Sequence, residues 1–260
     1  MNKLFSELFR YVPKETSFKL FGLVYFGVLL FIAVLIICMC IIFRNKSNET
    51  KQKVLNFSAV ALIVLYIFDF FVQPFWAGSM IVNKLPFHIC TATGVLIPFV
   101  TFNKRCSFLK TTITIWAVLA PLIWLIVPID VFNAPYRLYS YPILQSYMYH
   151  IIELFWGVFM IVSGSTKLDW KNIWQPIIGL IPMAIWATIG QELYYPNDLG
   201  ENYMFLRTDT TGLVPHWLFI VALFIGFSLL IAIVYFIYNS ILNKLSNKKC
   251  ESKEQMEMSK

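Results

Sequence analysis

The sequence has few charged residues, and this shortage excludes an ordinary soluble domain. Only 13% of its 260 residues are Asp, Glu, Lys or Arg, whereas soluble proteins average about a quarter. By contrast, 58% of the residues are hydrophobic and 17% are aromatic. A composition this apolar predicts a polytopic membrane protein.

Organised cysteines and metal-binding clusters are also missing. The five cysteines form no CxxC pair and have no regular spacing, which argues against a disulfide framework and against a zinc ribbon. His150 and Glu153 form an isolated H-x-x-E pattern, but no dense His/Cys cluster accompanies it. We therefore expect neither a metal nor a cofactor.

The net charge is +7, but it does not indicate a nucleic-acid surface. The basic residues lie in short polar loops and in the C-terminal tail, where they are typical of topology determinants. Nucleic acid is therefore excluded as a partner. Membrane lipids are the expected partners, together with a lipid or small-molecule ligand, and the oligomeric state stays open.

A cleavable signal peptide, an internal repeat and a soluble domain are all missing from the pattern. The first residues have no apolar core with a small-residue cleavage site; their i, i+4 apolar spacing instead predicts a short helix on the membrane surface. The predicted organisation is an interfacial segment at 1–19, a transmembrane domain at 20–242, and a disordered basic cytoplasmic tail at 243–260.

Long apolar runs are what the sequence has in abundance. A span needs about 20 predominantly apolar residues. The shortest run opens at Pro86 and contains Pro98, which favours a tilted or broken helix. The fold class is therefore all-α, a bundle of seven transmembrane helices, at residues 20–43, 55–76, 86–102, 109–129, 142–163, 174–193 and 213–241.

The loop charges predict the orientation of this bundle. Seven spans place the termini on opposite sides, so the loops fall into two sets. The set that includes the C-terminal tail carries 14 Lys and Arg, and the set that includes the N-terminal segment carries 7. The positive-inside rule therefore predicts an external N-terminus and a cytoplasmic C-terminus.

The few polar residues within the spans converge on one side of the membrane. With the predicted orientation they all fall in the outer half, while the inner halves of the first, fourth and seventh spans carry no acid or histidine. Ionisable groups in spans are costly and typically mark function. We therefore predict an outward-facing polar pocket built from Asp69, His88, His150 and Glu153, to which Gln73, Gln191 and His216 could add.

The types of these residues suggest acid–base chemistry. His150 and Glu153 share a helix face at i, i+3, so the carboxylate could orient the imidazole as a general base. His88 could then serve as an acid or as a donor to an oxyanion. Substrate binding falls to the remaining polar residues near the outer edge, Asp69, Gln73, Gln191, Arg207 and His216.

Each assignment has a structural alternative. Asp69 and Gln73 could simply form hydrogen bonds between helices, and His150 with Glu153 could be a structural polar pair. His88 at the interface could meet lipid headgroups. Cys90 acts as a nucleophile only where a histidine or a helix N-terminus stabilises its thiolate, and packing is the simpler interpretation.

Three stretches together resemble the YwaF-like family of bacterial integral membrane proteins. They are LPFHIC, SYMYHIIELFWG, and ENYMFLR followed by Trp217, and their order and spacing extend over residues 55–240. The resemblance implies a bacterial plasma membrane location and a distant relation to eukaryotic acyltransferases acting on ether lysophospholipids. It matches His88 and His150 to family histidines. The acyltransferase cysteine, however, precedes the first histidine, where this chain has Phe87.

Three functions follow as alternatives. The first is a membrane enzyme that transfers or hydrolyses the acyl group of a lipid, with His150 as base. The second is a small-solute transporter or binding protein, in which the same groups hold a substrate or relay protons. The third is a non-catalytic subunit of a membrane complex. The shortage of charge in the inner halves favours a one-sided site over a through-going pathway.

Overall fold

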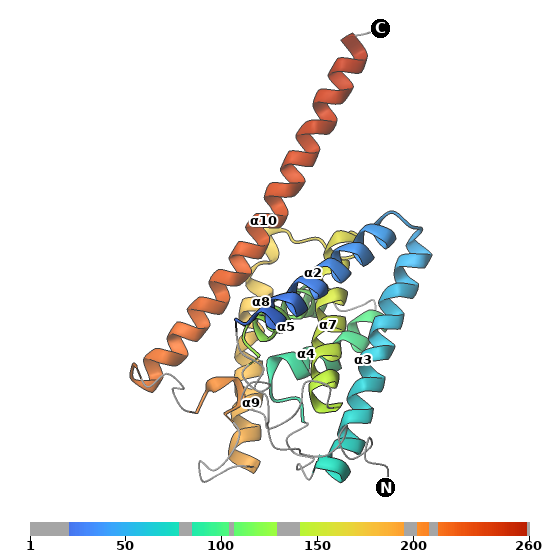
Figure 1. Ribbon diagram of the computed structural model, residues 1–260. Helices are drawn as coiled ribbons and strands as arrows, with labels where there is room; N and C mark the ends of the chain where they lie inside the picture. Colours follow the sequence, from blue (N-terminus) through green and yellow to red (C-terminus); the bar gives the residue numbers. More distant parts are fainter. Residues whose placement is uncertain are drawn as a thin grey trace.

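In the computed structural model, every regular element is a helix within the part of the chain that it describes, residues 21–77, 85–103, 107–128, 141–194, 202–207 and 213–258. The predicted all-α class is thereby confirmed. Figure 1 shows the helices α2 (Leu23–Arg44), α3 (Asn48–Ala77), α4 (Ile89–Phe102), α5 (Ser107–Ile126), α7 (Tyr141–Val162), α8 (Trp174–Ile178), α9 (Leu180–Tyr194) and α10 (His216–Met258), with short 3-10 turns η2 (Trp170–Asn172) and η3 (Tyr203–Phe205).

Five helical segments within the described ranges are long and apolar enough to cross a membrane. The prediction of seven spans is thus met only in part. Helix α4 has 14 residues and rises only about 21 Å at about 1.5 Å per residue, because the chain stays non-helical up to His88. The five segments are Leu23–Arg44, Asn48–Phe71, Phe108–Ile126, Trp170–Tyr194 and His216–Ile241.

The centre of the molecule is the contact between α5 and α7. Gly157 of α7 lies directly against Ala117 of α5, so close that a Cβ on Gly157 would be 2.8 Å from the Ala117 carbonyl carbon. Small residues at such a crossing let two helix backbones approach. At the preceding position of α7, the buried Trp156 indole donates a hydrogen bond of 3.1 Å to Thr101 Oγ1 of α4. These contacts make α4, α5 and α7 one packed unit.

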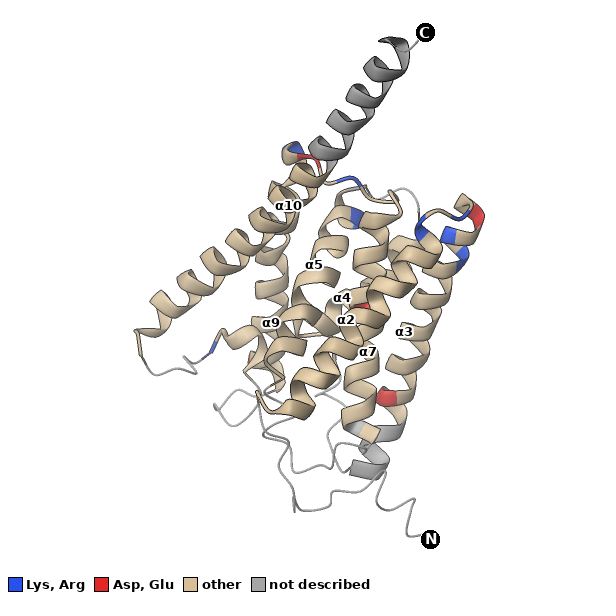
Figure 2. Ribbon diagram, turned by 45° about the horizontal axis from the view of Figure 1, so that its top comes forward, with Lys and Arg blue, Asp and Glu red and all other residues tan. Residues whose placement is uncertain are grey.

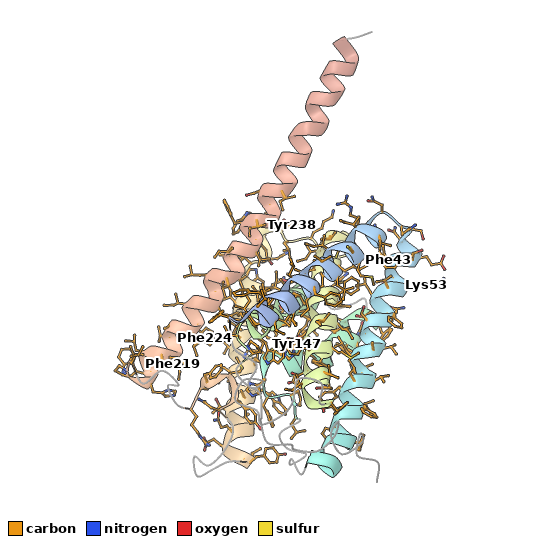
Figure 3. The ribbon with its side chains drawn as sticks, in the orientation of Figure 1. Phe43, Lys53, Tyr147, Phe219, Phe224 and Tyr238 are labelled. Atoms are coloured by element: carbon orange, nitrogen blue, oxygen red, sulfur yellow. The ribbon has the colours of Figure 1, made fainter. Side chains whose placement is uncertain are left out.

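Helices α2 and α10 present most of their apolar surface outward. Only 17% of the α2 span and 11% of the α10 span are buried, and side chains project all round the lower part of α10 in Figure 3. On α2, Cys40 is buried while Cys38 is exposed, because residues two apart lie on different faces of a helix. An apolar exterior of this extent is typical of a lipid-facing surface.

Basic residues gather at one end of the bundle. Two hydrogen bonds tie the elements together there: Lys51 Nζ of α3 donates to the Ser163 carbonyl at 3.3 Å, and Asn239 Nδ2 of α10 donates to the Leu168 carbonyl at 3.1 Å. Figure 2 shows most of the blue residues at this end. The basic end is defined by Arg44, Lys46, Lys51, Lys53, Lys167 and Lys171.

The opposite end holds the remaining helix termini. The indole of Trp186 in α9 donates to the Pro86 carbonyl at 3.0 Å, and the rings of Phe68 in α3 and Tyr141 in α7 lie 5.4 Å apart. Helix α3 therefore leads away from the basic end, whereas α7 leads back to it. This alternation brings together the halves of α3, α4 and α7 that lie away from the basic end.

The C-terminal segment departs from its expected conformation. Composition predicted disorder from residue 243, but α10 continues as helix to Met258. A charge-rich stretch cannot form a packed core, but it can still be helical. The chain has no Gly or Pro after Gly226, and Lys, Glu, Gln and Met are good helix formers. The predicted interfacial segment at 1–19 lies outside the described residues.

Candidate functional site

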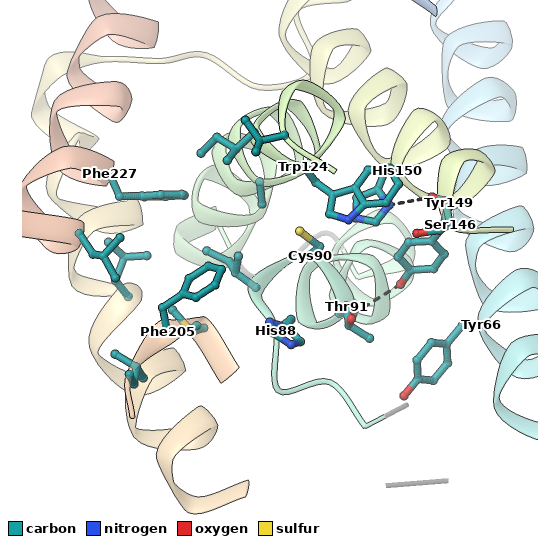
Figure 4. Close-up of a pocket in the computed structure, with 18 of the residues that line it drawn as sticks. Tyr66, His88, Cys90, Thr91, Trp124, Ser146, Tyr149, His150, Phe205 and Phe227 are labelled. Atoms are coloured by element: carbon teal, nitrogen blue, oxygen red, sulfur yellow. Dashed lines mark hydrogen bonds between the residues drawn. The ribbon is translucent and has the colours of Figure 1, made fainter. Parts of the chain in front are cut away.

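A cavity of about 610 Å³ lies in the half of the bundle away from the basic end. Its wall includes Asp69 of α3, His88 and Cys90 at the start of α4, and His150 of α7. Figure 4 shows Cys90 between the two histidines. Residues far apart in sequence, which were expected to converge, thus line one space; their chemical roles remain predictions.

His150 is held in one orientation by two contacts. Its ring stacks on the Trp124 indole of α5, with ring centroids 3.9 Å apart and planes inclined by 6°. Its Nδ1 lies 2.7 Å from the Ser146 carbonyl oxygen, which can only accept, so Nδ1 carries the proton in this contact. In the neutral ring Nε2 then keeps its lone pair, and no described residue bonds it. This geometry suits a general base.

Glu153 does not orient His150 as the sequence suggested. Its side chain is 0% exposed, neither carboxyl oxygen has a hydrogen-bond partner among the described residues, and it does not line the cavity. The Ser146 carbonyl takes the orienting place because helical side chains lean toward the N-terminus, over the preceding turn. The expected His–Glu contact is therefore replaced by a contact with the backbone.

The start of α4 positions His88 and Cys90. His88 is the N-cap residue, with φ −89° and ψ 147°, and its ring meets the Tyr203 ring edge-on at a centroid distance of 5.1 Å. Cys90 follows in the first turn, is partly exposed, and faces the cavity. Phe87 is buried against Tyr203 in a separate apolar cluster. Packing is thus the role of Phe87, whereas Cys90 is accessible to a ligand.

The other predicted binding residues lie apart from the cavity wall. Gln191 is buried in α9, Arg207 forms an ion pair of 3.0 Å with Glu192, and His216 Nε2 donates to the Leu206 carbonyl at 2.7 Å. None of the three lines the cavity. Gln73 belongs to α3, but its side chain is outside the described part of the chain.

Several cavity residues were missed from the sequence. Ser146 lies four residues before His150, so helical spacing could have identified it. Trp124 had no comparable signal, because a tryptophan in an apolar span is ordinary. The apolar wall also went unnoticed; it is formed by Met204, Phe205 and Leu206 around η3 and by Ile220, Leu223, Phe224 and Phe227 of α10.

The cavity is therefore amphipathic. Figure 4 shows His88, Cys90 and His150 on the side of α4 and α7, with Phe205 and Phe227 across from them. No group of three metal-ligating side chains occurs among the described residues. The arrangement fits a ligand with one polar and one apolar part.

Comparison with known proteins gives one family. The model described as the TMEM164 family matches residues 17–238. No curated protein and no solved structure matches the chain. The resemblance to the YwaF-like family is therefore wrong: the stretches that carried it lie inside the region matched by another family, and short aromatic motifs at helix ends distinguish poorly between membrane proteins of similar composition.

Proposed function

The chain belongs to the TMEM164 family and is a multi-pass membrane protein. We propose that it is an enzyme that transfers or hydrolyses the acyl group of a lipid. The observation that carries the proposal is the cavity in which His150, with the lone pair of Nε2 available, faces the same space as His88 and Cys90. Resemblance to an acyltransferase plays no part in this proposal.

The wall of the cavity supports a lipid as substrate. Leu223, Phe224 and Phe227 of α10 offer an apolar surface for an acyl chain, while the ester group would lie against the histidines. A volume of about 610 Å³ falls within the range of ligand sites, about 300–1,000 Å³. A substrate with a polar ester and an apolar tail matches both halves.

The chemistry needs one base and one hydrogen-bond donor. His150 Nε2 takes the proton of an acceptor hydroxyl, from a lysolipid or from water, as that oxygen attacks the ester carbonyl carbon. His88 donates a hydrogen bond to the resulting oxyanion. The ester C–O bond then breaks, and the leaving alkoxide takes the proton from the His150 imidazolium. The acyl group thus ends on the acceptor oxygen, and the proton taken from the acceptor hydroxyl ends on the leaving group.

The membrane topology is part of the proposal. We propose that all seven hydrophobic segments, α4 and α7 included, lie across the plasma membrane of a bacterial cell with the basic end in the cytoplasm. The alternation of helix ends and the collection of Lys and Arg at one end support this arrangement. The cavity would then open toward the outer half of the membrane.

Lipid turnover by the purified protein tests the function. Full-length protein in phospholipid nanodiscs receives a lysophospholipid with a different chain, and mass spectrometry measures the acyl composition. We expect new chain combinations or released fatty acid with the native protein, and loss of both with His150→Gln. Trp124→Leu removes the ring that stacks on His150 and should reduce the rate at least tenfold, whereas Trp174→Leu, at an exposed position of α8, should not.

Two results would separate the alternatives. Loss of activity with Cys90→Ala would indicate that the Cys90 sulfur, rather than the acceptor hydroxyl, attacks the ester, with His150 still the base. Absence of any lipid turnover, together with solute accumulation by proteoliposomes, would contradict the enzyme and favour the transporter.

A further inference from the structure

A second hollow lies on the outside of the bundle, between α2, α3 and α7. Its volume is about 490 Å³, and it shares no lining residue with the cavity. Its walls are almost entirely apolar, with Leu35 and Met39 on α2, Phe57 and Ala61 on α3, and Ile152 on α7. A hollow of this kind on a lipid-facing surface is suited to a hydrocarbon chain.

The dimensions of this groove match one leaflet of a bilayer. Along α3 it extends from Thr50 to Ala61, a rise of about 16 Å at about 1.5 Å per residue. The hydrocarbon core of a membrane is about 30 Å thick, so one leaflet contributes about 15 Å. The groove therefore starts at the basic end and stops near the membrane centre.

Positive charge stands at the mouth of the groove. Lys53 is part of the lining, and Figure 3 shows it beside Phe43 where α2 and α3 meet. Lys53 pairs with Glu49 at 2.6 Å, but both side chains are more than 70% exposed, at 73% and 76%; such pairs contribute little. Arg44, the last residue of α2, and Lys46 of the adjoining link are both exposed, so the mouth has an excess of positive charge.

We propose that this groove binds an anionic phospholipid of the leaflet at the basic end. One acyl chain lies between α2 and α3, and the phosphate meets Lys53, with Arg44 and Lys46 close by. Helix α3 also begins at this mouth, so its N-terminal dipole favours the same charge. The proposal is independent of catalysis, because the groove and the cavity have no residue in common.

Anionic rather than zwitterionic lipid follows from the charges. A phosphatidylcholine headgroup brings a cation next to Lys53, Arg44 and Lys46, which cancels the attraction. A phosphatidylglycerol headgroup keeps its full negative charge, and juxtamembrane basic residues bind such headgroups between helices. The apolar groove alone would accept either lipid, so headgroup preference is the property that distinguishes a specific lipid-binding site from a nonspecific apolar surface.

Native mass spectrometry of the full-length chain tests the site. Equal amounts of palmitoyl-oleoyl phosphatidylglycerol and phosphatidylcholine are titrated against the protein in detergent, and occupancy of the first bound lipid is measured. We expect a several-fold preference for phosphatidylglycerol. Lys53→Gln should lower its affinity about fivefold, which corresponds to the ~1 kcal/mol of one basic side chain. Ala61→Phe, which fills the groove, should lower the affinity of both lipids.

Lys167→Gln is the matched control, because Lys167 is an exposed lysine at the basic end that does not line the groove. It should leave the preference unchanged. Equal occupancy by the two lipids, or equal losses with Lys53→Gln and Lys167→Gln, would overturn the proposal. Lipid turnover in the cavity is measured separately and does not depend on this result.

Discussion

Gly94 shows how a single residue shapes the cavity. It lies in α4 beneath the ring of Tyr149, and a Cβ at this position would come within 1.9 Å of the tyrosine hydroxyl oxygen. That hydroxyl donates to the Thr91 carbonyl at 3.5 Å, and Tyr149 is itself part of the cavity wall. The absence of a side chain at Gly94 therefore lets the hydroxyl end of Tyr149 pack closely against α4.

The change Gly94→Ala should destabilise the protein by about 1–3 kcal/mol, the usual cost of overpacking. Unfolding in detergent, followed by tryptophan fluorescence, measures the loss. Gly27→Ala is the control, because nothing lies within 4 Å of the added Cβ and alanine favours helix. Combining Gly94→Ala with Tyr149→Leu should recover stability; equal effects of the two alanine variants would contradict this account.

The contact with Ser146 makes a prediction about the His150 ring itself. Because Nδ1 donates to a carbonyl oxygen, the neutral imidazole should carry its proton on Nδ1. Nitrogen-15 NMR of the full-length, histidine-labelled protein at neutral pH distinguishes the two tautomers, and His150→Gln assigns the signal. A ring protonated on Nε2 would show that Nε2 cannot be the base.

At the scale of elements, the loop 202–207 forms one side of the cavity and is held under strain. Met204 and Phe205 have φ of 52° and 59°, a left-handed conformation that costs roughly 1–2 kcal/mol per non-glycine residue. Two contacts oppose this strain, the bond from His216 to the Leu206 carbonyl and the ion pair of Arg207 with Glu192. The loop is therefore the part of the wall that opens most easily.

The two contacts should differ in how strongly they stabilise the loop 202–207. Glu192 is 64% exposed in its ion pair, so Glu192→Gln should have little effect. His216→Ala removes a partly buried hydrogen bond and should raise the hydrogen-exchange rate of residues 202–207 several-fold. Mass spectrometry of peptides from the full-length protein measures both, with Trp217→Ala, at an exposed neighbouring position, as control. An equal or larger effect of Glu192→Gln would contradict this ranking.

At the scale of the whole molecule, the two ends of the bundle differ in charge. The basic end unites the link between α2 and α3, the end of α7 and the middle of α10 through the Lys51 and Asn239 hydrogen bonds. The cavity lies toward the opposite end, where α4 and α10 begin. This polarity underlies the proposed orientation.

Cysteine labelling tests that orientation in whole cells. The five native cysteines are replaced by alanine, and single cysteines are introduced as Lys167→Cys at the basic end or Leu213→Cys at the opposite end. Both positions are exposed. A membrane-impermeant maleimide should label only Leu213→Cys in intact cells and both variants after lysis. Labelling of Lys167→Cys in intact cells would reverse the orientation.

The helical class and the lipid-facing character could be predicted because they depend on local properties. Apolar runs place α2, α5 and α7 within three residues of their observed bounds, whereas α3 begins seven residues before its predicted start and α10 continues 17 residues beyond its predicted end. Even the convergence of Asp69, His88 and His150 was accessible, since the depth of each follows from its position along a span.

The sequence by itself therefore determined an all-helical membrane protein with polar groups in one half. Only the tertiary structure decided which of those groups meet: it placed Cys90 in the cavity and Glu153 outside it, and brought Trp124 onto His150. The reason is that composition and periodicity assign a residue to a depth and a helix face, whereas the neighbour across that face depends on how helices cross. Contacts such as Gly157 with Ala117 determine those crossings, and no local pattern reveals them.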